Sequence, residues 1–222
     1  MTTFIQHRKL LFFVILIATF ACNLNEQNTD KKIASRKNEQ FTEEFKKTNF
    51  YYKISESASG LTKQKVIYNP SYFVIDYPNG DVPPDKGVCC DVVIRTYRKL
   101  GIDLQKEVHE DMTSNFSEYP HKWGLNTTDK NIDHRRVPNL MKFFERKKAS
   151  LPITTQSKDY NFGDIVCWDL GRGLTHIGIV IVERTKDEQR NLIVHNIGGG
   201  QVIADCLFRF KIIGHYRFKD GK

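Results

Sequence analysis

Three residues of the sequence have side chains that could together activate a nucleophile: Cys89, His176 and His195. A thiol attacks an acyl carbon as the thiolate, and the free N–H groups at a helix N-terminus favour that form. A neighbouring imidazole can take the thiol proton, and a third polar group orients this imidazole. The pattern predicts Cys89 as nucleophile, His176 as base and His195 as the orienting residue. Asn196 is the alternative to His195. Only one of them can orient His176, because successive residues of a strand face opposite sides of a sheet.

These assignments have alternatives. Cys89 could be a small buried residue at a helix start, and His176 could be a histidine of the core. Cysteine, histidine and aspartate side chains could also bind zinc. The sequence contains neither a C-x₂-C pair nor an H-E-x-x-H string, so we expect no metal ion. The predicted chemistry also needs no organic cofactor.

Two adjacent arginines, Arg135 and Arg136, lie in a turn-like segment before an apolar run. Together they could form a fork that binds a substrate carboxylate. The alternative is that Asp133 caps the following helix and that the arginines are solvated charges. We treat both arginines as candidate substrate-binding residues.

The spacing of apolar residues predicts the elements that position these side chains. Residues 88–100 have an apolar face at helical spacing and end at Gly101, so Cys89 is expected in the first turn of a helix. Further helices are expected at residues 137–147, opening around Pro138, and at residues 41–57, whereas residues 103–131 are expected to be irregular. Strands are expected at residues 164–169, 176–183, 191–196 and 210–218. Helices followed by antiparallel strands are typical of an α+β fold, in which the two histidine strands are neighbours.

The first 22 residues have the features of an export signal. Arg8 and Lys9 precede an apolar run that is too short to cross a bilayer as a mature helix. Cys22 follows a small residue, as at a lipoprotein processing site, and is the candidate lipid attachment residue. We expect an exported, membrane-anchored protein of the cell envelope or periplasm, with a polar tether over residues 23–40 and one domain over residues 41–222.

The formal net charge of the 222-residue chain is +8 at pH 7. Such an excess could favour nucleic acid, an anionic membrane or an acidic cell-wall polymer. No basic stripe with interleaved aromatic residues accompanies it, so we expect no nucleic-acid partner. The cysteines lack the regular spacing of a disulfide framework, and Cys167 and Cys206 are expected to be buried thiols.

The order of these motifs resembles that of the NlpC/P60 cysteine amidases and peptidases. Those domains have a cysteine, an apolar helix and a glycine twelve residues later, as from Cys89 to Gly101. A Gly-Asp strand follows, matched by residues 163–164, and then a strand beginning with His176 and one carrying His195. The resemblance implies a papain-like fold in which the nucleophile helix packs on a small antiparallel sheet. A longer hairpin between the two histidine strands is the clear departure from the pattern.

Longer strings of the sequence resemble a narrower bacterial family, domain-of-unknown-function family 1287. These strings cover residues 87–89, 91–95, 108–112, 131–140, 168–171 and 194–198. Where that family has Cys-Thr-Asp, this chain has Cys89-Cys90-Asp91, so Cys89 keeps the nucleophile position. Trp168 and Asn196 lie in the shared strings, and we add them to the candidate substrate-binding residues.

The resemblance implies an exported cysteine hydrolase that cleaves an amide or peptide bond through an acyl-enzyme. The expected partners are cell-wall peptidoglycan or a peptide-like amide, and a membrane through Cys22. Two other functions remain open. One is a thiol acyltransferase or lipid-amide hydrolase on the same scaffold, and the other is a catalytically silent lipoprotein that binds the cell wall.

Overall fold

The computed structural model describes residues 42–219 of the chain. They belong to two units that divide between Thr48 and Asn49. In the first unit residues 42–48 are helical. The second begins with helix α2, Phe50–Leu61, which Asn49 caps by accepting a hydrogen bond from the Tyr52 N–H at 2.9 Å. The single helix predicted over residues 41–57 is therefore divided at Asn49, because a capping residue leaves the helical conformation.

The predicted export signal with Cys22 and the predicted tether over residues 23–40 lie outside the described residues. Within residues 42–219, no helix combines the length and the apolar character that a membrane span requires.

Helices α3, Cys89–Arg98, and α5, Val137–Arg146, confirm two predicted helices. Cys89 is the first residue of α3, and Pro138 lies in the first turn of α5, where its missing N–H costs no hydrogen bond. Short 3₁₀ turns lie at Phe116–Glu118, Asp133–Arg135 and Ser157–Asp159. The starts of α3 and α5, which both lie at the site, are thus determined by the local sequence.

Helix α4, Leu104–Ser114, corrects the expectation that residues 103–131 are irregular. Asp103 caps it, since its carboxylate accepts hydrogen bonds from the N–H groups of Gln105 and Lys106. Its buried apolar face consists of Leu104, Val108 and Met112, one turn apart. The cap and this spacing are both readable from the sequence, although polar residues outnumber the apolar ones here.

A five-stranded antiparallel sheet follows, in the order β6-β5-β4-β3-β7. Its strands are β3 (Ile165–Gly171), β4 (Leu174–Arg184), β5 (Asn191–Asn196), β6 (Gln201–Ala204) and β7 (Lys211–Tyr216). The predicted α+β class and the four predicted strands are confirmed, whereas β6 was not predicted. Two short strands, β1 (Ile67–Tyr68) and β2 (Lys86–Gly87), form a separate parallel pair.

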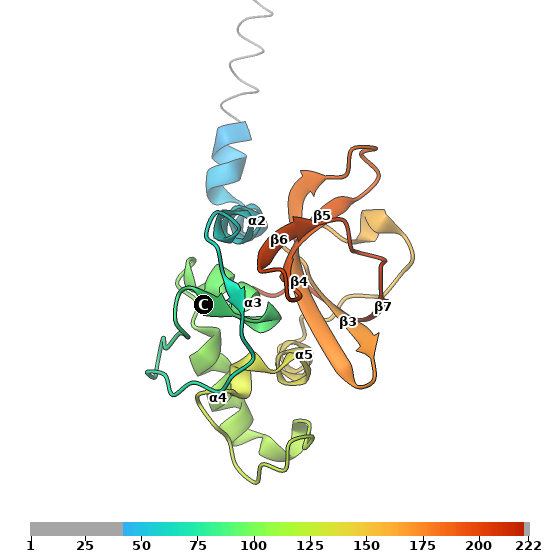
Figure 1. Ribbon diagram of the computed structural model, residues 1–222. Helices are drawn as coiled ribbons and strands as arrows, with labels where there is room; N and C mark the ends of the chain where they lie inside the picture. The colour runs from blue at the N-terminus through green and yellow to red at the C-terminus, as the bar shows by residue number, and fades with distance from the viewer. Residues whose placement is uncertain (1–41, 220–222) are drawn as a thin grey trace, which may run out of the picture. The chain divides into compact units, whose positions relative to one another are not determined.

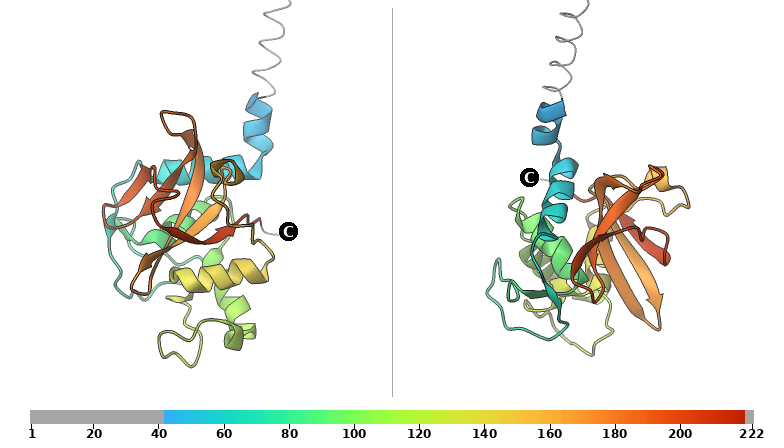
Figure 2. Two further views of the ribbon diagram at one scale, coloured as in Figure 1. Left: turned by 90° about the vertical axis from the view of Figure 1, so that its right-hand side faces the viewer. Right: turned by 45° about the horizontal axis from the view of Figure 1, so that its top comes forward.

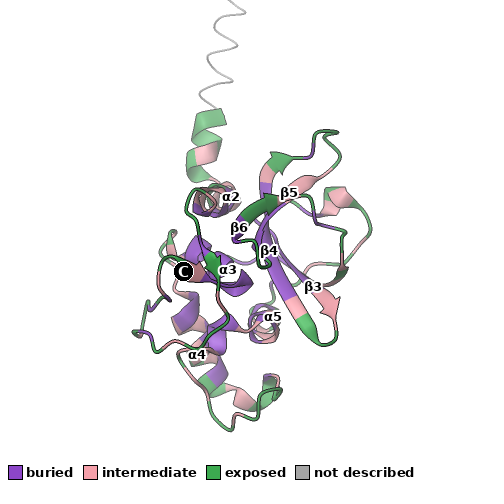
Figure 3. Ribbon diagram, viewed as in Figure 1, coloured by how far each residue is buried: buried purple, intermediate pink, exposed green. Residues whose placement is uncertain are grey.

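The two faces of the sheet bury different parts of the core. Ile177 and Ile179 of β4 belong to the larger cluster, with residues of α2, α3 and α5. Val180, on the other face, belongs to a smaller cluster with Trp168 and Leu207. Helices α2, α3 and α5 all contact β4, and they lie on one side of the sheet in Figures 1 and 2. Figure 3 shows that α3 and the middle of β4 are the most continuously buried elements. The predicted nucleophile helix therefore packs against the strand that carries His176.

Candidate active site

Cys89 lies at the point where α3 begins, and it is only 7% exposed. The preceding residue, Val88, has an extended backbone, and its N–H donates to the Asp91 carboxylate at 2.6 Å. This bond is half of a capping box and holds the chain in position as it enters the helix. The first N–H groups of a helix have no intrahelical acceptor. The thiol is therefore placed at the positive end of the helix dipole.

Asp91 is in turn held by Arg135, from the 3₁₀ turn that precedes α5. Nε and Nη2 of Arg135 donate to Oδ1 and Oδ2 of Asp91 at 2.9 and 3.1 Å, and Nη1 donates to the Ser71 carbonyl oxygen at 3.2 Å. Both charged side chains are buried. A bidentate pair of this kind fixes orientation as well as distance. The Arg135 fork, a predicted carboxylate binder, is thus occupied by the protein itself and holds the helix that carries Cys89.

The pairing of β4 with β5 brings the two candidate histidines together. Gly178 lies opposite His195, which makes positions 176 and 195 diagonal neighbours on one face. Nε2 of His176 lies 2.9 Å from Nδ1 of His195. Gly178 allows this approach, because a Cβ atom there would lie 2.8 Å from the side chain of Ile193 and 3.2 Å from the His195 Cβ. Glycine between the two histidines is a feature that the sequence analysis did not use.

The Cys89 thiol is more acidic than an ordinary cysteine thiol. The pKa of Cys89 is lowered to about 5. The largest cause is a hydrogen bond from Cys90, and the hydrogen bond and charge of His176 lower the pKa further, whereas burial raises it. Burial raises the pKa of Cys90, which therefore keeps its proton and can donate it. Since Nε2 of His176 is bonded to His195, Nδ1 is the ring nitrogen left for Cys89. The arrangement favours a thiolate beside an imidazole at neutral pH.

His195 is suited to orient His176 rather than to compete with it for a proton. Burial, together with the charges of His176 and Arg209, lowers the pKa of His195 to about 4. The ring is then neutral at pH 7 and has one acceptor nitrogen. If that acceptor is Nδ1, it receives the Nε2–H of His176 and leaves the second His176 nitrogen directed at other groups. The geometry thus places His195, and not Asn196, against His176.

The structure keeps Asn196 and Trp168 out of contact with solvent, although both were predicted to bind substrate. Nδ2 of Asn196 donates to the Gly87 carbonyl oxygen at 3.2 Å, which ties β5 to the chain just before the nucleophile. Nε1 of Trp168 donates to the Leu207 carbonyl oxygen at 2.8 Å, and its ring centroid lies 5.6 Å from that of His176. Both side chains are fully buried and bonded to backbone carbonyl groups, so they pack beneath the site and are not exposed to a substrate.

A groove of about 330 Å³ opens beside Cys89. The large exposed apolar side chains along it are Tyr68, Trp123 and Leu174, and Arg136 also lines it. The guanidinium carbon of Arg136 lies 4.1 Å from the centroid of the Trp123 ring. Tyr68, Trp123 and Leu174 come from segments far apart in the sequence and carry no local motif, so sequence reasoning did not find them. The groove offers a substrate access to the thiol from one side.

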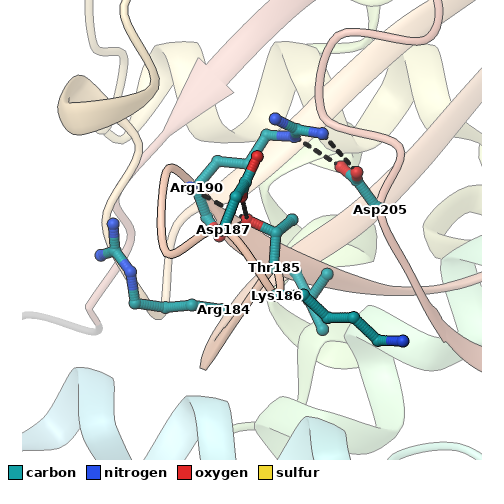
Figure 4. A pocket seen from close by; sticks show the side chains of 7 residues that line it. Arg184, Thr185, Lys186, Asp187, Arg190 and Asp205 are labelled. Atoms are coloured by element: carbon teal, nitrogen blue, oxygen red, sulfur yellow. Dashed lines mark hydrogen bonds and ion pairs between the residues drawn. The ribbon is translucent and has the colours of Figure 1, made fainter.

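A larger hollow, of about 430 Å³, lies at the hairpin between β4 and β5 (Figure 4). Two of its carboxylates are engaged within the lining, since Arg190 pairs with Asp205 and Thr185 donates to Asp187. The described residues that line it include neither cysteine nor histidine. We therefore place the candidate site in the smaller groove, which Cys89 lines.

Residues 55–218 match the family described as Domain of unknown function (DUF1287). The Uncharacterized protein YijF of Escherichia coli (strain K12) is 48% identical over 165 residues, which cover 74% of this chain and 80% of that protein. The family match spans Cys89, His176 and His195 together with the groove, so the candidate site lies inside the shared domain.

Proposed function

The chain belongs to the DUF1287 family, and from its site geometry we propose that it is a cysteine hydrolase that cleaves an amide or peptide bond. The observation that carries this proposal is the position of Cys89, at the start of α3 in a groove, near two histidines whose Nε2 and Nδ1 atoms lie 2.9 Å apart. The lowering of the Cys89 pKa to about 5 agrees with this geometry. A buried structural thiol behaves in the opposite way, as at Cys167, whose pKa is raised by burial. Perturbed acidity with a specific partner in a cleft is typical of catalytic groups.

In the acylation step, the Cys89 thiolate forms a bond to the substrate carbonyl carbon, and the carbonyl electrons move to the oxygen. Backbone N–H groups of Cys89 and its neighbours at the start of α3 stabilise this oxyanion. Protonated His176, held through Nε2 by His195, gives its other ring proton to the amide nitrogen. The C–N bond then breaks, the amine leaves, and a thioester remains on Cys89.

In the deacylation step, water attacks the thioester carbon while neutral His176 takes one water proton. The new tetrahedral intermediate collapses, the C–S bond breaks, and the product leaves as a carboxylic acid. Cys89 is again a thiolate, and His176 again carries its second proton. The cycle uses no metal ion and no organic cofactor.

We propose further that the domain is a papain-like domain of the NlpC/P60 type. Support comes from the order of the parts: a cysteine at a helix start, then antiparallel strands that carry a base and an orienting residue. The helix packs on the strand of the base, as that arrangement requires. Fold analogy of this kind supports a reaction class and does not identify a substrate.

The substrate we propose is an amide or peptide bond in cell-wall peptidoglycan. The proposal combines the export signal predicted at residues 1–22 with a groove of about 330 Å³ beside Cys89. A lipid on Cys22 would hold the enzyme at the membrane, next to that polymer. Detergent partitioning and the N-terminal mass of the native protein test this anchor.

A thiol acyltransferase or lipid-amide hydrolase is the second candidate. The apolar rim of the groove favours it, because Leu174 is 63% exposed, and Tyr68 and Trp123 are each 40% exposed. Exposed apolar side chains beside a nucleophile would suit an acyl chain. The two candidates share the acyl-enzyme and differ in what removes the acyl group. The low pKa of Cys89 argues against the third alternative, a silent wall-binding protein.

The first test is the pH dependence of alkylation of Cys89 by iodoacetamide, followed by mass spectrometry of the labelled peptide. We expect a midpoint near pH 5, because the pKa of Cys89 is lowered to about 5, and a higher midpoint in His176→Ala. A midpoint at pH 8–9, about that of a free thiol, would overturn the proposal.

Purified protein incubated with peptidoglycan should release fragments that are heavier by one water for each bond cleaved. Cys89→Ala should release none, His176→Ala should be slower by about three orders of magnitude or more, and His195→Ala should be affected less, because an orienting residue is only partly needed. Transfer of the acyl group to an added amine in place of water would instead identify the acyltransferase.

A further inference from the structure

We propose that Arg136, stacked on Trp123, forms a subsite that binds a carboxylate of the substrate, so that the enzyme selects anionic amides and peptides. The inference rests on the proposed function, since it assigns specificity to the same groove. It also separates the two adjacent arginines: Arg136 recognises the ligand, and Arg135 only positions the nucleophile helix.

The position of Arg136 in the groove is well defined. It lies directly before α5, and its carbonyl oxygen accepts hydrogen bonds from the N–H groups of Asn139 and Leu140 at 3.0 and 3.1 Å. Its guanidinium carbon lies 4.1 Å from the Trp123 ring centroid. A guanidinium held over an aromatic ring keeps its N–H groups, which lie in its own plane, free to donate. The two side chains therefore form a preorganised donor edge beside Cys89.

The charge of Arg136 has no carboxylate in direct contact within the described residues. Its guanidinium makes no ion pair and no hydrogen bond there. Two carboxylates influence it through their charge, Asp133 and Asp129. Asp133 uses Oδ2 for His109 and the Asp129 N–H, while its buried Oδ1 has no hydrogen-bond partner. Asp129 accepts hydrogen bonds from Tyr72 and the Asn131 N–H. Burial lowers the pKa of Arg136, and the negative charges of Asp133 and Asp129 offset this partial dehydration of the cation only in part. An anionic ligand would provide the Arg136 guanidinium with a direct hydrogen-bond acceptor and a negative charge.

Arg135 gives the internal comparison. Its guanidinium donates to both oxygens of Asp91 and to the Ser71 carbonyl oxygen, and its side chain is 2% exposed. Every strong acceptor that it needs is already in the protein. Two arginines adjacent in sequence thus differ in the one property that decides ligand binding, the presence of an unused donor edge.

The test compares alkylating probes that differ only in charge. Iodoacetate is matched with iodoacetamide, and N-iodoacetylglycine with N-iodoacetylglycinamide; the second pair places the carboxylate farther from the sulfur. Rates at Cys89 are measured by mass spectrometry at low and moderate salt, and each acid-to-amide ratio is normalised to the ratio for free cysteine. We expect at least one acid to be favoured by about tenfold in the wild type, which corresponds to one charge-assisted hydrogen bond.

Arg136→Gln should remove this preference, and Arg136→Lys should retain only part of it, because a lysine lacks the planar fork. Arg172→Gln is the matched control: it removes one exposed positive charge near Gly173 at the groove without touching its lining, and should change the ratio less than about twofold. Equal ratios in the wild type and in Arg136→Gln, with Cys89 still labelled at low pH, would overturn the subsite and leave the hydrolase proposal intact. Failure of every probe to label Cys89 would overturn both.

Discussion

Cys90 influences the chemistry at Cys89 although its own thiol is not suited to attack. It is 1% exposed, and burial raises its pKa, whereas its hydrogen bond makes the largest contribution to the low pKa of Cys89. A proton on one sulfur thus stabilises the negative charge on the next. At the scale of single residues, the acidity of the proposed nucleophile depends on a neighbour that is not its proposed base.

Cys90→Ala should therefore raise the pKa of Cys89 above its value of about 5, since the donor is removed. Cys90→Ser is the matched variant: a hydroxyl can donate in the same way, and most turnover should be preserved. The measurement is the alkylation midpoint of Cys89 in each variant. If Cys90, rather than Cys89, proved to be the thiol that reacts at low pH, the nucleophile would be assigned one residue too early.

At the scale of elements, helix α3, which begins with Cys89, is held by a series of contacts that starts outside it. Arg135 holds Asp91, Asp91 accepts the Val88 N–H, and Asn196 donates to the carbonyl oxygen of Gly87. The turn before α5 and strand β5 thus both fix the point where α3 begins. Because the ion pair between Arg135 and Asp91 is buried, removing one partner leaves the charge of the other without compensation.

Asp91→Asn should lower the free energy of unfolding by about 3–5 kcal/mol, the usual effect of breaking a buried pair. The double variant Asp91→Asn with Arg135→Met should recover part of this loss, because no unpaired cation is then buried. Urea denaturation at pH 7 measures both. A loss below about 1 kcal/mol for Asp91→Asn would mean that water reaches Arg135 and that the contact resembles a surface ion pair.

At the scale of the whole molecule, two buried histidines make folding sensitive to acid. Burial lowers the pKa of His134 to about 3 and that of His195 to about 4, whereas the unfolded chain binds these protons near pH 6.5. Both pKa values are depressed by folding, so the stability they contribute is complete above about pH 6.5. It is lost progressively as the pH falls from about 6.5 to the folded-state values, because over this range the unfolded chain binds protons that the folded protein does not.

The unfolding free energy should therefore decrease between pH 6 and 4 by up to about 1.4 kcal/mol per pH unit for each of these two histidines. His134→Gln should reduce this slope by about one proton. His121→Gln is the control, because His121 is exposed and stays hydrated in both states. Denaturation curves across that pH range measure the slopes. An unchanged slope in His134→Gln would show that His134 is protonated within the fold.

The sequence by itself determined those features that depend on near neighbours along the chain. The start of α3 at Cys89, the α5 start around Pro138 and four strands follow from periodicity, turn residues and caps, which act within a few residues. Helix α4 belongs to the same class, since its cap and apolar spacing are local, although its polar composition hid it.

Only the tertiary structure decided the features that depend on which segments meet. Strand register placed His195, and not Asn196, against His176, since Gly178 pairs with His195. Arg135 is buried and paired with Asp91, which is distant in the sequence, whereas Arg136 lies over Trp123 in the groove. Adjacent arginines have the same local pattern. The difference between them comes from long-range packing, which sets the solvation and the charge partner of each side chain and leaves no periodic trace in the sequence.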